Sequence, residues 1–398
     1  MTKSRYLTLI LILGSLTALG PFSIDMYLPG FQAIAIDLKT DKVALSLSSF
    51  FVGISAGQLL YGPLLDRFGR KKPLYIGLSI YILASLGCAF ATDIDTFIIL
   101  RFVQAIGSCA AGVASVAMVR DLFPVHENAK VFALLMLVLG VSPMIAPAIG
   151  GYVTVAFGWH SVFLILMAIG FLNLIASWLW LPNSFKPDIN MSLKPKPIIK
   201  GFLAVLKVPQ FYTYAFTGAL AFAGLFAYVS GSPLLFMTIF KVKEETYGWI
   251  FAFLSIGLIG ASNINTILLK KFSSERIIVF ASFAQLIVTL CFIIGGIFNW
   301  YGLGTTIFLL FLFLCCLGFV SPNASALTLF PFTKNAGTAS ALMGAVQMGI
   351  GAIASVGVGV FNVTSMVPMA GIMALTSTMA FTILLLGRKK IIESATVN

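Results

Sequence analysis

The chain of 398 residues is too apolar to be an ordinary soluble domain. Hydrophobic residues make up 59% of it, charged residues only 10%, and the mean hydropathy is +1.03. Soluble domains carry about 25% charged residues, so the composition predicts a membrane protein. The net charge of +12 would suit binding to nucleic acid or to an anionic membrane surface, and its distribution along the chain decides between them.

Apolar runs of transmembrane length recur along the chain. A helix needs about 20 apolar residues to cross the hydrocarbon core. The runs are continuous rather than alternating, which favours helices over the strands of a barrel. We therefore expect an all-α membrane protein with twelve transmembrane helices, at 6–28, 43–65, 73–92, 96–119, 130–156, 161–181, 209–237, 247–269, 277–298, 302–330, 336–361 and 366–387.

The basic residues predict the orientation of these spans. With the N-terminus in the cytoplasm, 20 of the 25 Lys and Arg fall on the cytoplasmic side, four fall outside, and Arg101 lies within a span. This asymmetry is the positive-inside pattern, so both termini are expected in the cytoplasm. The lipid bilayer, including its anionic headgroups, is then the expected partner of the basic side, and no nucleic acid is expected.

A Pro- and Lys-containing segment divides the spans into six and six. We expect a first bundle at 1–181, a cytoplasmic linker at 182–208 and a second bundle at 209–398. A faint repeat supports this division, because Leu-Leu-Asp-Arg-Phe at 64–68 corresponds to Leu-Leu-Lys-Lys-Phe at 268–272. Two parallel six-helix halves are a transporter layout in which the binding site lies near mid-membrane.

Two charged residues, Asp25 and Arg101, fall well inside the predicted spans. A charge in the hydrocarbon region is costly and usually marks an ion or substrate pathway. Helix rise places both residues in the outer half of the membrane, so they could share one cavity. The repeat offset leads from them to Val229 and Thr305, which are uncharged. Ion coupling is therefore expected in the N-terminal half.

The short loop between the second and third spans carries a dense motif, Gly-Pro-Leu-Leu-Asp-Arg-Phe-Gly-Arg-Lys-Lys at 62–72. Glycine permits a tight turn close to another helix. The acid could face a helix N-terminus or a cation such as Arg120. This motif resembles the signature loop of the major facilitator superfamily, which latches the cytoplasmic gate in the outward-facing state. The resemblance implies a gating loop with Gly62, Asp66, Arg67, Gly69, Arg70 and Arg120.

Two further segments resemble motifs of the same superfamily. Arg-Phe-Val-Gln-Ala-Ile-Gly at 101–107 resembles its arginine-bearing motif, and the Gly- and Pro-rich stretch 140–151 resembles its antiporter motif. This chain has Ser142-Pro143 where Gly-Pro is usual. Proline and glycine at this density bend a helix or allow close helix packing. The predicted hinge residues are Gly140, Pro143, Pro147, Gly150 and Gly151.

Three shorter segments, at 23–29, 119–123 and 337–342, resemble the bicyclomycin-resistance (Bcr/CflA) branch of drug:proton antiporters. The resemblance implies the major facilitator fold of two pseudo-symmetric six-helix bundles in the bacterial inner membrane. It further implies a monomeric, proton-coupled drug or small-molecule antiporter that works by alternating access and needs no cofactor besides the proton gradient. Export of a siderophore or metabolite, or import by proton symport, would suit the same fold.

Asp25 is the predicted proton carrier, since a buried carboxyl near an arginine can titrate near physiological pH. Arg101 either tunes Asp25 or binds an anionic group of the substrate, and a static ion pair between the two is the alternative. Polar groups within the spans either line the substrate cavity or bond neighbouring helices. Tyr27, Gln104 and Gln347 are the candidates for the cavity.

Signals for other functions are weak. The Gly-x-Ser-x-Gly pattern at 53–57 lies in a predicted span, outside the strand-turn-helix context of a hydrolase, and is better interpreted as a packing face of GxxxG type. The sequence contains no phosphate-binding loop, and its five cysteines lack the spacing of metal ligands. A transporter is therefore expected rather than an enzyme, a channel or a metalloprotein.

Overall fold

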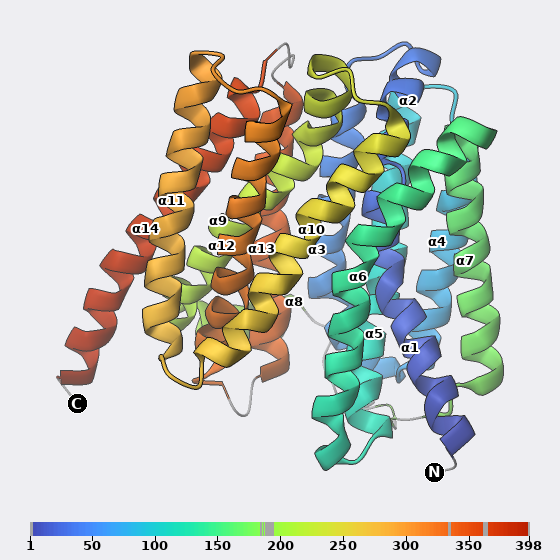
Figure 1. Cartoon of the computed structure of the whole chain (residues 1–398). Helices are drawn as coiled ribbons and strands as arrows, with labels where there is room; N and C mark the ends of the chain where they lie inside the picture. Colours follow the sequence, from blue (N-terminus) through green and yellow to red (C-terminus); the bar gives the residue numbers. More distant parts are fainter. Residues whose placement is uncertain are drawn as a thin grey trace. The chain divides into compact units, whose positions relative to one another are not determined.

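The computed structural model describes residues 3–183, 185, 187, 195–332, 336–360 and 365–396. Twelve helical segments in this part of the chain are long and apolar enough to cross a membrane, which confirms the predicted all-α fold class (Figure 1). The long helices are α1 (Lys3–Asp25), α3 (Val43–Phe68), α4 (Lys71–Ala89), α5 (Ile94–Leu122), α6 (Val125–Phe157), α7 (Trp159–Trp180), α9 (Pro209–Pro233), α10 (Glu244–Leu268), α11 (Ser274–Ile297), α12 (Leu303–Leu329), α13 (Ala336–Val360) and α14 (Val367–Thr396).

Four shorter elements complete the described structure. A 3₁₀ turn, η1 (Leu28–Gly30), and the helix α2 (Phe31–Asp37) extend the first span beyond α1, and a π-helical segment, η2 (Leu234–Ile239), extends α9. The helix α8 (Pro195–Leu206) lies within the range expected as a linker. Proline is tolerated in the first turn of a helix, where its missing N–H has no partner to lose, so the prolines at 195 and 197 do not prevent α8.

The chain forms two compact units. Unit 1 comprises Met1–Pro195 and Glu244–Ala252, and unit 2 comprises Lys196–Lys243 and Phe253–Asn398. Unit 1 therefore holds α1 to α7 together with the first turns of α10. The first change from unit 1 to unit 2, between Pro195 and Lys196, falls inside the predicted linker. The segment Glu244–Ala252 belongs to unit 1 although it follows the linker in sequence.

Small residues bring the helices of unit 1 close together. A Cβ on Gly53 would lie 2.6 Å from the Cβ of Ala105, and one on Gly57 would lie 2.7 Å from the Cβ of Cys109. Both glycines of the Gly-x-Ser-x-Gly pattern thus face α5, as a GxxxG packing face does. Gly107 of α5 faces α4 in the same way, since its Cβ would lie 2.6 Å from the backbone nitrogen of Tyr81. These contacts make α5 the central helix of unit 1.

In unit 2, α9 packs against α12, α13 and α14, and α11 packs against α12 and α14. Glycine again sets the spacing. A Cβ on Gly218 would lie 2.8 Å from Ala324 of α12, and one on Gly231 would lie 2.8 Å from the sulfur of Met369. The helix α9 is thus the central helix of its unit.

Candidate functional site

Asp25 is the last residue of α1, at the point where the first span loses its regular helix. Pro21 lies within α1, and Met26 and Tyr27 form a turn before η1, which contains Pro29. Proline at these positions removes helix-stabilising N–H donors, which accounts for the break. The side chain of Asp25 is only 5% exposed. Within the described part of the chain its carboxyl group has neither a hydrogen bond nor an ion pair.

Arg101 lies on α5 and is fully buried, at 0% exposure. One of its terminal nitrogens, Nη2, donates to the backbone carbonyl of Ser23 at 2.9 Å, and the other, Nη1, donates to Oε1 of Gln104. Aromatic rings cover the guanidinium, with its carbon 4.2 Å from the ring centre of Tyr27 and 4.3 Å from that of Phe50. Such cation–π contacts stabilise a desolvated cation. The residue thus joins α5 to the end of α1.

A chain of hydrogen bonds extends this contact to α4. Nε2 of Gln104 donates to Oγ of Ser85 at 2.8 Å, and the Ser85 hydroxyl donates to the backbone carbonyl of Tyr81 at 2.7 Å. The Tyr81 hydroxyl is in turn 2.8 Å from Oγ of Ser23. The backbone carbonyl of Ser23 also accepts the hydrogen bond from Arg101. The network therefore closes on the last turn of α1 and fixes the relative orientation of α1, α4 and α5.

The two predicted charged residues, Asp25 and Arg101, do not interact directly. Arg101 and Asp25 form no ion pair within the described residues. The static ion pair considered from the sequence is therefore not what the fold builds. Arg101 instead binds the backbone of Ser23, two residues before Asp25, and so holds the helix end that carries the carboxyl group.

The glycines of the predicted hinge in α6 pack against different neighbours. A Cβ on Gly150 would overlap the backbone carbonyl oxygen of Met26 and would lie 2.7 Å from its carbon. A Cβ on Gly151 would lie 2.9 Å from the backbone oxygen of Glu244. Gly150 thus lets α6 touch the helix break directly after Asp25, a contact that the sequence motif alone did not predict.

The remaining hinge residues lie inside an uninterrupted helix. Gly140, Pro143 and Pro147 all fall within α6, which runs continuously from Val125 to Phe157. The hydroxyl of Ser142 donates to the carbonyl of Val138 at 2.7 Å, which is the residue-to-i−4 bond that serine makes at helix bends. The motif therefore supplies a contact surface in α6 without ending the helix.

The loop between α3 and α4 is held by Arg70. Its Nη1 donates to Oδ1 of Asp66 at 2.6 Å, and its Nε donates to Oδ2 of Asp121 on α5 at 2.8 Å. Burial alone would lower the pKa of Arg70, but the hydrogen bonds and charges of the two carboxylates outweigh it and raise that pKa above its ordinary value. The guanidinium also lies 4.0 Å from the ring centre of Phe185.

The other loop residues have separate places. Gly69 takes a positive φ of 80°, a conformation that favours glycine. Gly62 has open space around it, and Arg67 lies beside the ring of Phe68. Arg120 contacts the ring of Phe132 rather than Asp66, so the suggested partner of the acid is wrong. Successive helical residues point about 100° apart, and it is Asp121 that faces the loop.

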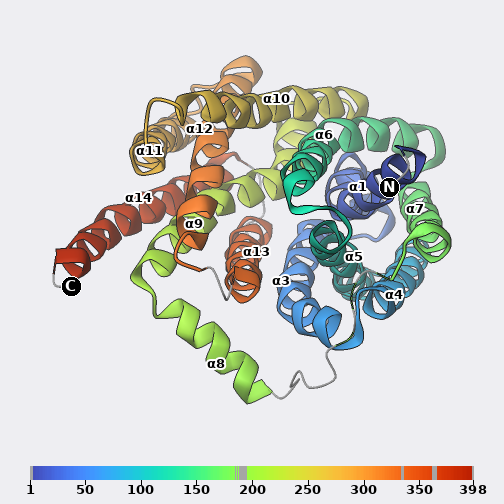
Figure 2. The ribbon, with the colours of Figure 1, turned by 90° about the horizontal axis from the view of Figure 1, so that it is seen from below.

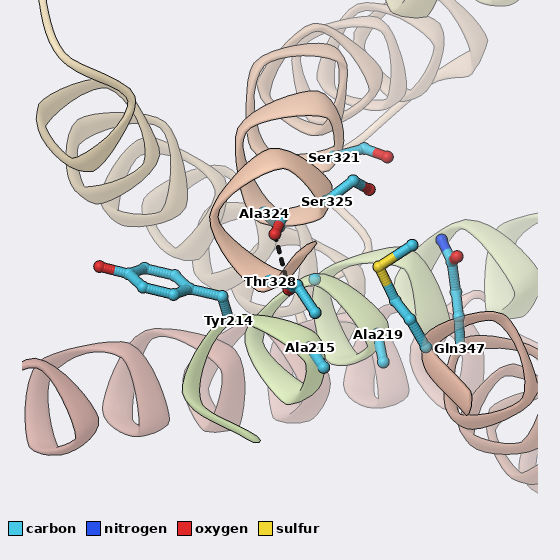
Figure 3. Close-up of a pocket in the computed structure, with 10 residues that line it drawn as sticks. Tyr214, Ala215, Ala219, Ser321, Ala324, Ser325, Thr328 and Gln347 are labelled. Atoms are coloured by element: carbon cyan, nitrogen blue, oxygen red, sulfur yellow. Dashed lines mark hydrogen bonds between the residues drawn. The ribbon is translucent and has the colours of Figure 1, made fainter. Parts of the chain in front are cut away.

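The candidate cavity residues fall in different surroundings. Tyr27 and Gln104 are buried within unit 1, at 1% and 0% exposure. Gln347 lies on α13 and lines a pocket of unit 2 with residues of α9 and α12, shown in Figure 3. The cavity itself has a volume of about 10 Å³, which is room for about one water molecule, whereas drug-sized sites have about 300–1,000 Å³. Its lining is Tyr214, Ala215, Gly218, Ala219, Ser321, Ala324, Ser325, Thr328, Met343 and Gln347.

Comparison with known proteins decides the family. The model of the Major Facilitator Superfamily matches residues 11–356. The chain belongs to this superfamily. It is therefore a multi-pass membrane transporter rather than an enzyme, as its composition and its motifs predicted.

Relatives and solved structures of the superfamily agree with this assignment. The chain is 35% identical to the uncharacterized MFS-type transporter YdgK of Bacillus subtilis, with 94% of each chain covered. It is 32% identical to the bicyclomycin resistance protein homolog of Haemophilus influenzae, with 88% of each covered. A bacterial homologue of the human lysosomal transporter Spinster has the same fold, with a TM-score of 0.75 at 14% identity over 97% of this chain and 96% of that one.

Sequence reasoning found both buried charges but missed most of their surroundings. Ser23, Tyr81 and Ser85 carry ordinary side chains, and no motif marks them as partners of Arg101. The sequence did contain one signal for this network. Tyr81 and Ser85 lie four residues apart and therefore share a helix face, so the two side chains could have been expected to point toward the same neighbours. The aromatic cover of the guanidinium has no such signal, because Phe50 belongs to a different helix.

Proposed function

We propose that this transporter exports drugs or similar small molecules in exchange for protons, with Asp25 as the proton carrier. The observation that carries the proposal is the buried and unpartnered carboxyl group of Asp25 at the end of α1. An ionised group in such surroundings is costly, and function is the usual reason for retaining it. The likeness to a bicyclomycin resistance protein homolog supports an antibiotic or a related compound as the cargo.

Alternating access would couple the two fluxes through Asp25. In the outward-facing state the carboxyl takes a proton from outside, and in the inward-facing state it releases that proton as the substrate binds. A cationic or polar substrate binds better to the ionised site than to the neutral one. This difference in affinity couples the two fluxes, because a ligand shifts an equilibrium only by its differential affinity for the two states, and the proton gradient supplies the driving force.

Arg101 serves, on this proposal, as a positioning residue. Both of its terminal nitrogens are engaged, one by the Ser23 carbonyl and one by Gln104, and rings cover its faces. These contacts favour a role in holding α1 over direct binding of an anionic substrate. Tyr27 and Gln104 then support the proton site, while Gln347 and its pocket contribute to substrate contact.

The loop between α3 and α4 is proposed as a gate latch on the cytoplasmic side. Arg70 bonds the loop to Asp121 of α5, and charge-assisted bonds of this kind are strong yet reversible. The distribution of Lys and Arg supports cytoplasmic termini, and the bacterial relatives support the inner (cytoplasmic) membrane of a bacterium as the location. Both charged residues and the loop partners lie within one unit of one chain, which supports a monomer as the working form.

Two experiments test this function. A deletion strain is first screened for growth with bicyclomycin, chloramphenicol and ethidium, and under iron limitation to reveal siderophore export. The compound with the largest effect is then added to proteoliposomes that contain a trapped pH dye, with no initial pH gradient. Antiport makes the lumen alkaline as the substrate enters, whereas symport makes it acidic. Uptake without a pH change beyond that in protein-free vesicles would refute proton coupling.

A further inference from the structure

The helix α8 has a basic, partly apolar side that faces away from its own unit. Lys196, Lys200 and Lys207 are exposed, and none of them forms an ion pair within the described part of the chain. Lys207 directly follows α8 and still makes a helical bond to the carbonyl of Leu203. At about 100° per residue, these three lysines lie within about 40° of one another around the axis.

Two large apolar side chains lie beside this lysine face. Ile199 and Leu203 are four residues apart, and they are 53% and 51% exposed. On the helical wheel they fall between the lysines and the apolar side of α8. The combination of an apolar strip with adjacent basic groups is typical of helices that lie at a membrane surface.

The opposite side of α8 is occupied by protein. Val205 is only 2% exposed, and a Cβ on Gly201 would lie 3.9 Å from Cγ2 of Thr338 on α13. These two residues are four positions apart and therefore share one face of the helix. The helix thus rests on unit 2 along one side and presents its lysines and its apolar strip on another.

Chain connectivity keeps α8 at the membrane boundary. It ends at Leu206, and the membrane-spanning segment begins at Pro209. Three Cα–Cα steps of about 3.8 Å allow at most about 11 Å between these ends. In Figure 2, α13 is seen end-on and α8 is seen lengthwise. The helix α8 therefore runs across the end of its unit, close to the level at which the span enters the bilayer.

We propose that this side of α8 binds the surface of an anionic bilayer. Ile199 and Leu203 enter the boundary between headgroups and acyl chains, and the three lysines contact lipid phosphates. Lysine suits this position because its long aliphatic stem can follow the apolar surface while its ammonium group stays among the headgroups. The attraction depends on lipid charge. The proposal holds for any substrate and any direction of transport.

The test uses the full-length protein with Leu203→Cys carrying an environment-sensitive fluorophore, in a background that lacks the exposed Cys291. The protein is reconstituted in vesicles of phosphatidylcholine alone or with increasing phosphatidylglycerol. The expected result is a blue shift and quenching by lipids that carry a spin label near the headgroup, both increasing with phosphatidylglycerol. Lys200→Gln should shift the half-maximal response to a higher phosphatidylglycerol content, because one lysine fewer faces the lipid phosphates.

The matched control keeps the number of lost charges constant. The triple variant K196Q/K200Q/K207Q should lose the phosphatidylglycerol dependence, whereas K270Q/K271Q/K390Q, at exposed lysines elsewhere on the same side, should retain it. A thermal unfolding midpoint equal to that of the parent protein shows that each variant is folded. Absence of lipid quenching in the parent protein would overturn the proposal, as would equal responses in the two triple variants. Either result would assign the exposed side of α8 to another partner.

Discussion

Gly150→Ala is the substitution for which the structure makes the sharpest prediction. A Cβ at this position would lie 2.7 Å from the carbonyl carbon of Met26 and would overlap its oxygen. Ordinary contacts between carbon atoms are about 3.5–4.0 Å, so α6 and the helix break must separate by at least about 1 Å. Both obstacles are backbone, which cannot change rotamer to make room.

The loss of unfolding free energy in Gly150→Ala should lie at the upper end of the range measured for overpacked interiors. Inserting a methyl group into a well-packed interior typically costs about 1–3 kcal/mol, and backbone against backbone leaves little scope for relaxation. We expect a destabilisation of about 3 kcal/mol. The displaced segment begins one residue after Asp25, so the carboxyl group should move with it. Proton-coupled transport should therefore fall at least ten-fold even where the protein remains folded.

The assay combines thermal unfolding in detergent with transport in proteoliposomes at matched protein content. Gly112→Ala is the control, because a Cβ on this glycine of α5 would meet no atom within 4 Å. It should be neutral or slightly stabilising, since alanine favours helix more than glycine does. Wild-type stability and transport in Gly150→Ala would refute the reasoning, because the close contact between α6 and the helix break would then be unnecessary.

Three further predictions follow from individual contacts. Arg101→Lys should cost about 1.5–3 kcal/mol of unfolding free energy, because an ammonium group cannot replace the planar fork and its ring contacts; unchanged thermal stability would contradict this. Asp121→Asn should destabilise the loop between α3 and α4 more than Asp66→Asn does, because Asp121 is 14% exposed and Asp66 is 44% exposed beside Arg70; equal unfolding midpoints would argue against it. The backbone N–H of residue 96 lowers the pKa of Asp93, the N-cap of α5, so its stabilising effect is present at neutral pH and is lost as pH falls through the lowered pKa. Asp93→Ala should therefore reduce stability at neutral pH by more than it does in acid, and a difference independent of pH would count against this cap.

Local patterns predicted much of the fold. Hydropathy located the twelve helices of the described residues that are long and apolar enough to cross a membrane. A span must satisfy its backbone bonds within itself, so its signal is contained in one stretch of sequence. The same argument identified Asp25 and Arg101 as unusual, since each stands alone in an apolar run. The motif glycines at 53 and 57 were assigned to packing for a similar local reason.

Contacts between helices were beyond this reasoning. A rotation of about 100° separates Arg120 from Asp121, and only the packing of α5 decides which of them faces the loop between α3 and α4. The partners of Arg101 come from α1, from the turn after it and from α3, as well as from α5 itself, so most of them depend on tertiary structure. The helix α8 was expected as part of a linker because its prolines usually mark loops, although they occupy the first turn, where proline is tolerated.

The most direct test of the central claim compares two modes of transport in Asp25→Asn. The amide keeps the size of the carboxyl group but cannot exchange a proton at physiological pH. The account predicts that this variant still exchanges labelled for unlabelled substrate across proteoliposomes, yet no longer accumulates substrate against its gradient when a proton gradient is imposed. An accumulation ratio equal to that of the wild type, at matched protein content, would contradict the assignment of Asp25 as the proton carrier.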